Sequence, residues 1–213
     1  MKKTLIFAIG LLSLASCEKE PSLDNIQDQV VTYTQYDKNA NFSDASTFFV
    51  ADQILLIGKT KDVQYLDAAD AIPIITEVVK MMNSRGYTQV SNIDDADLGI
   101  QMSYVKDTYY FTTTNYPYWW MGFPGYWSPG FWGGYWDWYY PYVNVFSYSN
   151  GSLLTDMVNL QDDTSVTTGS QPKLPVIWQS YSVGLLGRTE QINVNKMVES
   201  VKQAFAQSPY IQK

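Results

Sequence analysis

The stretch from residue 116 to residue 142 restricts the fold of this chain more than any other part of the sequence. It reads YPYWWMGFPGYWSPGFWGGYWDWYYPY, and 15 of its 27 residues are Tyr, Trp or Phe, while five are Gly and four are Pro. Proline interrupts helices and is excluded from central strands, and clustered glycine weakens both. This stretch, called the aromatic tract below, is therefore predicted to be an irregular loop held by a regular scaffold.

The amino-terminal sequence, MKKTLIFAIGLLSLASC, predicts export and lipidation. Two lysines precede an apolar segment that has the length of a signal peptide and is too short to span a bilayer. The segment ends in Leu-Ala-Ser before Cys17, an order that resembles the lipobox of bacterial lipoproteins. This resemblance implies removal of residues 1–16, a lipid on Cys17 and a tether over residues 17–27. The alternative is an ordinary secretory signal with an incidental cysteine.

A lipid on Cys17 would make the membrane the first partner of this protein. We therefore expect it in the bacterial cell envelope, anchored at the outer membrane on the periplasmic face or at the cell surface. Lys19 and Glu20 resemble the charged signal that sends some Bacteroidetes lipoproteins to the surface. Cys17 is the only cysteine, so no disulfide can stabilise the exported fold, which must depend on its core.

Composition removes several classes of function. The chain has no histidine, and this excludes His-based triads and His metal sites. Its net charge is −7 and it has no basic run, so nucleic acid is not an expected partner. Asp37, Asn39 and Asn41 imitate the start of a calcium loop, but Phe42 and Phe48 stand where that loop needs Gly and Glu. These residues predict an Asx-type turn instead, and no metal or cofactor is expected.

Hydrophobic periodicity predicts a single α+β domain over residues 28–208, followed by a tail over 209–213. Strands are predicted at 30–36, 47–50, 98–111, 143–148, 153–160 and 176–185, with helices from 67 to 86 and from Asn193 or Asn195 to just before Pro209. Two helices on one face of a mostly antiparallel sheet would form a two-layer sandwich. The strands before and after the aromatic tract could pair, which would make the tract a long hairpin connection at one end of the sheet.

Two strands have a predicted orientation. Residues 98–104 alternate between apolar and polar or small side chains, which is typical of a strand with one buried face. Trp178 is expected to point into the core, while Gln179 should point to the opposite face and cost little when changed.

A series of short motifs resembles the bacterial lipoprotein family called domain of unknown function 4136. The motifs are Tyr36-Asp37, Ala40-Asn41-Phe42-Ser43, Thr47-Phe48, Arg85-Gly86-Tyr87, Asp95-Ala96-Asp97-Leu98, Gly151 with Leu154 and Asp156, and a strand containing Trp178. Their order, over roughly residues 30 to 206, carries the resemblance. It implies an envelope location and no particular activity.

The aromatic tract is the candidate binding region, with Asp137 as its only charge. Its other candidate residues are Trp119, Trp120, Trp127, Trp132, Trp136 and Trp138. Exposed rings would suit an envelope protein, a lipid surface or a glycan, whereas rings packed on the sheet would form a structural lid. We expect a non-catalytic binding or structural module. The alternative is a glycan-active or glycan-binding protein with the tract as a sugar platform, in which Asp137 could act as an acid but lacks an identifiable partner.

Overall fold

The computed structural model describes residues 30–57, 63–106, 129–132, 137–141, 151–161, 173–187 and 189–213. Several predictions lie outside these residues: the signal peptide with Cys17 and the tether, the strand at 143–148, and Trp119, Trp120, Trp127 and Trp136. For Asp137 only the backbone is described.

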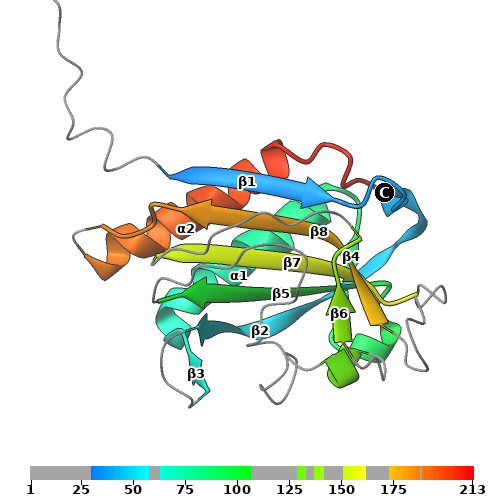
Figure 1. Ribbon diagram of the computed structural model, residues 1–213, viewed down its shortest axis with the longest axis horizontal. Coiled ribbons are helices and arrows are strands. Elements are labelled where there is room, and N and C mark those ends of the chain that lie inside the picture. The colour runs from blue at the N-terminus through cyan, green and yellow to red at the C-terminus, as the bar shows by residue number, and fades with distance from the viewer. Residues whose placement is uncertain are drawn as a thin grey trace, which may run out of the picture.

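The described residues form a mixed eight-stranded sheet (Figure 1). Its strands are β1 (Val31–Tyr36), β2 (Thr47–Ile57), β3 (Gln64–Tyr65), β4 (Thr88–Gln89), β5 (Leu98–Val105), β6 (Asp137–Tyr139), β7 (Ser152–Asn159) and β8 (Lys173–Val183). The main order is β1-β8-β7-β5-β2-β3, with β4 beside β2 and β6 beside β8. The pairs β1-β8, β7-β8, β5-β7 and β2-β3 are antiparallel, and β2-β5, β2-β4 and β6-β8 are parallel.

Two helices, α1 (Ala68–Ser84) and α2 (Glu190–Ala206), cover one face of this sheet (Figure 1). Short 3-10 helices occur at η2 (Phe42–Asp44), η3 (Ile93–Asp95) and η6 (Pro129–Trp132). This is the predicted α+β two-layer arrangement. No helix within the described ranges is long and apolar enough to cross a membrane.

The start of α1 matches the prediction, whereas the start of α2 does not. Asp67 caps α1 by accepting a hydrogen bond from the Ala69 N–H at 2.9 Å. Helix α2 begins at Glu190, before Asn193 and Asn195, so neither asparagine is its cap. The Asn193 side chain instead accepts a hydrogen bond from the Gly187 N–H. From inside the first turn of α2, Asn193 therefore holds the chain that leads into the helix.

The main core lies between the helices and the sheet, and Trp178 is its largest member. Its indole is 1% exposed, its ring centroid lies 5.5 Å from that of Phe205 on α2, and its Nε1 donates to Ser208 Oγ at 2.9 Å. The register of β7 against β8 shifts between Met157 and Val158. This bulge allows the consecutive residues Ile177 and Trp178 to join the same core.

Residues 209–213, predicted to be a tail, pack against the domain. Ile211 is completely buried, and the Tyr210 and Tyr36 rings are stacked with centroids 3.8 Å apart. The Arg85 guanidinium donates to the carbonyl oxygens of Phe205, Ser208 and Ile211 at 2.6, 3.1 and 3.2 Å. The carbonyl of Phe205 is in the last turn of α2, where intrahelical donors are lacking, and those of Ser208 and Ile211 follow the helix, so Arg85 joins the end of α2 to the chain after it.

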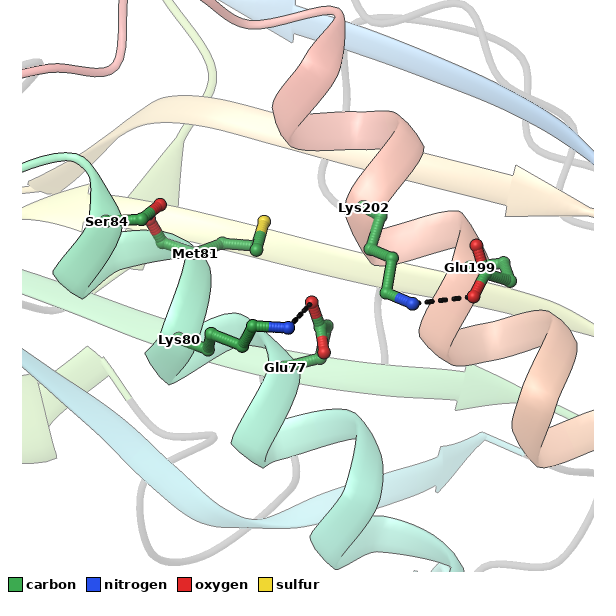
Figure 2. A network of polar contacts seen from close by, with 6 residues as sticks. All are labelled: Glu77, Lys80, Met81, Ser84, Glu199 and Lys202. Carbon is green, nitrogen blue, oxygen red and sulfur yellow. Dashed lines mark hydrogen bonds and ion pairs between the residues drawn. The ribbon is translucent and has the colours of Figure 1, made fainter.

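Two ion pairs of the helices are drawn in Figure 2, each between residues three apart within one helix. Lys80 lies 3.4 Å from Glu77 in α1, and Lys202 lies 2.6 Å from Glu199 in α2. The pair in α2 is exposed and contributes little to stability, whereas Glu77 in α1 is buried.

Both faces of the central strands are buried. All eight residues of β5 are buried, so the prediction of a strand with one dry face is wrong. Gln179 does point away from Trp178, but it is 0% exposed and hydrogen-bonded to Asp156, which argues against the expectation that changing it costs little. The physical reason is that a second layer covers the face opposite the helices.

We predict that Trp178→Ala lowers the free energy of unfolding by about 3–5 kcal/mol, because it leaves a large cavity and removes the hydrogen bond from the indole to Ser208. Urea denaturation at pH 7 measures the loss. Trp178→Phe, which keeps most of the ring volume, is the matched control and should lose clearly less. Equal losses for the two variants would show that the cavity is not the cause of the destabilisation.

Candidate functional site: the second sheet face and its end cleft

The described part of the aromatic tract packs on the sheet face opposite the helices. Figure 1 shows β6 lying across that face near one end of the central strands. Trp132 from η6 and Trp138 from β6 are 1% and 2% exposed, and their rings meet edge to face with centroids 6.0 Å apart. They form a second core with Val158, Leu174 and Val176. These two candidate binding residues therefore act as core residues and offer no free ring face to a ligand.

A glycine makes room for one of these indoles. A Cβ atom built on Gly99 of β5 would lie 2.3 Å from Cζ3 and 2.5 Å from Cε3 of Trp132. Because real Cβ contacts are never that short, only glycine allows the Trp132 ring to lie flat against the strand. The sequence of β5 is thus fitted to the tract that covers it.

The tract lies between β5 and β7, which pair with each other, whereas the strand predicted at 143–148 as the partner of residues 98–111 lies outside the described residues. The tract does not stay at one end of the sheet. The end of β5 pairs with the start of β7, Val105 opposite Ser152. Strand β6, which comes from the tract, pairs instead with Lys173–Pro175 at the start of β8. That start lies beside the end of β7, where Val158 pairs with Val176. The chain between β5 and β7 therefore reaches the opposite end of these strands before it returns.

A row of polar side chains crosses the sheet beneath this cover. Gln35, Gln179, Asp156 and Gln101 stand on the neighbouring strands β1, β8, β7 and β5, each in register with the next. Gln179, Asp156 and Gln101 are each no more than 1% exposed. Polar groups in so buried a row need hydrogen-bond partners to offset the loss of water.

Tyr140, the residue after β6, reaches this row from the tract. Its hydroxyl donates to Asp156 Oδ1 at 3.2 Å and accepts from Gln179 Nε2 at 3.2 Å, while Gln179 Nε2 also donates to Asp156 Oδ1 at 2.8 Å. Within the described ranges, Asp156 Oδ2 and both amide atoms of Gln101 have no hydrogen-bond partner.

Burial raises the pKa of Asp156 to about 7, and the hydrogen bonds from Gln179 and Tyr140 only partly oppose that rise. No cation in the described part of the chain contributes to this shift. A buried carboxyl without a cation is more stable in its neutral form. Near pH 7, Asp156 is therefore partly a neutral acid and partly a carboxylate.

An open cleft of about 600 Å³ lies at the end of the sheet, beside the tract. Tyr139 and Pro141 form one wall, so the segment that sends Tyr140 inward sends its neighbours to the cleft. The remaining lining is largely polar and comprises Asp37, Asn39, Asn41, Asp44, Asp97, Asn159 and Gln161 with Ala40, Ala45, Leu98 and Ile177. We call this the end cleft.

The carboxylates of the end cleft are held in fixed positions by local hydrogen bonds. Asp37 Oδ1 accepts from the Asn39 N–H at 2.9 Å, which is the predicted Asx turn, and Asp44 Oδ1 accepts from Asn41 Nδ2 at 2.7 Å. Asp97 Oδ2 accepts from the N–H groups of Ser46 and Thr47 at 2.7 and 2.9 Å. These bonds fix one oxygen of each carboxylate.

The pKa of Asp97 moves opposite to that of Asp156. Partial burial acts to raise it, but the N–H groups of Ser46 and Thr47, the Thr47 side chain and the charge of Lys213 outweigh burial and hold it below its usual range. Asp97 is therefore an ionised hydrogen-bond acceptor at neutral pH. Among the described residues, no three acidic or cysteine side chains are grouped as a metal site requires.

The residues that build this site were mostly missed by the sequence analysis. Asp156 was noted only as a family motif, and Tyr139 and Tyr140 only as members of the tract. A signal was present at Asp156, because a single carboxylate inside a largely apolar strand pattern is unusual unless its partners lie on adjacent strands. Strand order was needed to identify those partners.

The comparisons with known proteins place the chain in a family. The domain of unknown function family DUF4136 matches residues 32–210. A crystal structure of a DUF4136 family protein from Bacteroides thetaiotaomicron VPI-5482 is 44% identical, with a TM-score of 0.74 over 87% of this chain and 98% of that chain. The chain therefore belongs to the DUF4136 family.

Two further structures have much lower similarity. The PelC dodecamer from Paraburkholderia phytofirmans is 8% identical, with a TM-score of 0.35 over 87% of this chain and 99% of that one. A PDZ domain protein from Parabacteroides distasonis ATCC 8503 is 16% identical, with a TM-score of 0.42 over 87% of this chain and 37% of that one. Neither likeness supports an argument about function. No curated protein matches this chain.

We predict that Gly99→Ala lowers the free energy of unfolding by about 1–3 kcal/mol, because the added methyl group forces the Trp132 ring away from β5. Urea denaturation measures the effect. The double-mutant cycle with Trp132→Ala is the control, since the methyl group should cost much less once the indole is gone. Additive losses would show that Gly99 is not matched to Trp132.

Proposed function

We propose that this protein is a lipid-anchored module of the bacterial envelope that binds a ligand without catalysis, in the end cleft. The observation that carries the proposal is the meeting, in one open cleft, of a ring from the tract with fixed carboxylates and with amides. The buried indoles give the tract a structural role as well, because they hold the Tyr139 wall against the sheet.

The chemistry of the end cleft favours a sugar over an apolar ligand. Carboxylate and amide side chains accept and donate hydrogen bonds to hydroxyl groups, and an aromatic ring offers a flat apolar surface to a sugar ring. Asp37 and Asp44 each keep an oxygen that is not used by the turn bonds described above. We therefore propose a glycan as the ligand, with Tyr139 taking the place that the sequence analysis gave to the tryptophans.

Two observations support binding over hydrolysis. A glycosidase needs a carboxylic acid whose pKa is raised so that it can protonate the leaving group. Asp97, in the cleft, has its pKa lowered. Asp156 has its pKa raised, but it is 1% exposed beneath Tyr140 and does not line the cleft.

We predict that Tyr139→Ala weakens oligosaccharide binding by about tenfold, equivalent to about 1.4 kcal/mol, because the ring wall of the cleft is lost. Calorimetry with a panel of soluble envelope oligosaccharides measures the affinities. Tyr65→Ala, which changes a 38% exposed tyrosine on β3, is the matched control and should bind normally. If no oligosaccharide binds the unchanged protein, the glycan proposal is wrong.

The proposed anchor is tested separately. We predict that Cys17→Ala leaves an unprocessed precursor or releases the protein from the membrane fraction, because the lipid requires the Cys17 sulfur. Fractionation and immunoblotting of cells that express the full chain measure both outcomes. An alanine variant that is still cleaved and still found wholly with the membranes would contradict lipidation at this site.

A further inference from the structure

The segment that forms a wall of the end cleft is attached to the sheet by the pairing of β6 with β8 and, at Tyr140, by hydrogen bonds to Gln179 and to one buried carboxyl group. Tyr140 donates to Asp156 Oδ1 at 3.2 Å, and its two neighbours, Tyr139 and Pro141, line the cleft. Any change in the bond between Tyr140 and Asp156 therefore acts on that wall. We call residues 139–141 the wall segment.

The hydrogen-bond arrangement around Asp156 can accommodate a neutral acid. Oδ1 already accepts from Gln179 and Tyr140. Oδ2 has no partner among the described residues, and neither has either amide atom of Gln101, which stands opposite Asp156 on β5. A proton on Oδ2 would let it donate to Gln101 Oε1, and one hydrogen bond would then satisfy two buried acceptors.

Among the described residues, the groups that face Asp156 include no positive charge to stabilise its ionised form. They are Gln101 from β5, Gln179 from β8 and the Tyr140 phenol from the wall segment, and Gln35 follows Gln179 on β1. An ionised carboxylate at this position would be buried with two hydrogen bonds and no cation. It would be stabilised by the entry of water, which requires the cover to move.

We propose that Asp156 is a proton-operated latch for the wall segment: its neutral carboxyl is stable beneath the closed segment, whereas loss of the proton leaves a buried charge that requires water and so loosens the segment and the cleft wall with it. This deepens the proposed function, because the wall segment belongs to the end cleft. The latch itself is a property of the protein without ligand.

The direction of the pH effect follows from proton linkage. The closed form holds its proton up to about pH 7, whereas a solvated aspartate in the open form titrates near pH 4. Opening therefore releases a proton between these values and is favoured up to about tenfold for each pH unit. Below about pH 4 and above about pH 7 Asp156 has the same charge in both forms, so the equilibrium between the closed and open forms should not depend on pH there.

Hydrogen exchange of the β6 backbone amides, expressed as protection factors and followed by NMR, tests the latch. Protection of β6 should fall by up to about tenfold per pH unit from about pH 4.5 to about pH 7 and then remain constant. In Asp156→Asn the protection of β6 should not change with pH, because the amide keeps the Oδ1 acceptor and can donate to Gln101 at every pH. Asp94→Asn, at an exposed carboxylate on η3, is the matched control and should keep the full slope.

Either of two results from these samples overturns the latch: a level protection profile in the unchanged protein, or the same slope in Asp156→Asn. The ¹³C shift of the Asp156 carboxyl in the unchanged protein covers the case in which the variant does not fold. A neutral carboxyl at pH 5 supports the latch, and an ionised one overturns it. Because no ligand is added, a failed latch leaves glycan binding standing, and an absence of glycan binding leaves the latch standing.

Discussion

Burial of the central strands on both faces is the constraint on which the rest of this structure depends. On one face the strands meet two amphipathic helices, and the apolar residues of β5, such as Ile100 and Met102, pack there. On the other face, Gly99 and Gln101 of the same strand lie under the aromatic tract. A sheet covered twice must accommodate every side chain it carries. For this reason one face has a glycine beneath an indole and a row of polar residues on neighbouring strands, two of which, Gln179 and Asp156, are hydrogen-bonded to each other.

The aromatic tract combines a structural role with the proposed binding role, and the sequence analysis had treated these two roles as alternatives. Trp132 and Trp138 are core residues, and a loop anchored by large buried rings has little freedom at the neighbouring positions. Tyr139 and Tyr140 follow directly and point to different surroundings, one to the end cleft and the other to Asp156. Rigid support beside a ligand-accessible residue is a general way to hold a binding group in place. A lid and a site can therefore be the same segment.

Most of the scaffold could be predicted, because its signals are local. The periodicity of α1, the Asp67 cap and the turn at Asp37 all depend on residues within a few positions of one another. The second layer could not be predicted, since alternation in β5 shows which residues share a face but not what covers that face. The candidate site was missed for the same reason: Asp156 acquires its partners from β5, β8 and the tract, and only strand order brings them together.

The hydrogen bonds of Arg85 to carbonyls near the carboxyl end also determine when the domain can finish folding during synthesis. A ribosome makes the amino end first, yet β1 pairs with β8, and the carbonyls that Arg85 holds belong to residues 205, 208 and 211. While the nascent chain is short, α1 can form, but the arginine at its end has nothing to hold and the first strand has no neighbour. Contacts between the two ends of a chain are slow to form because the long loop must close before they are gained. The domain is therefore completed late, after nearly all of its residues have been synthesised.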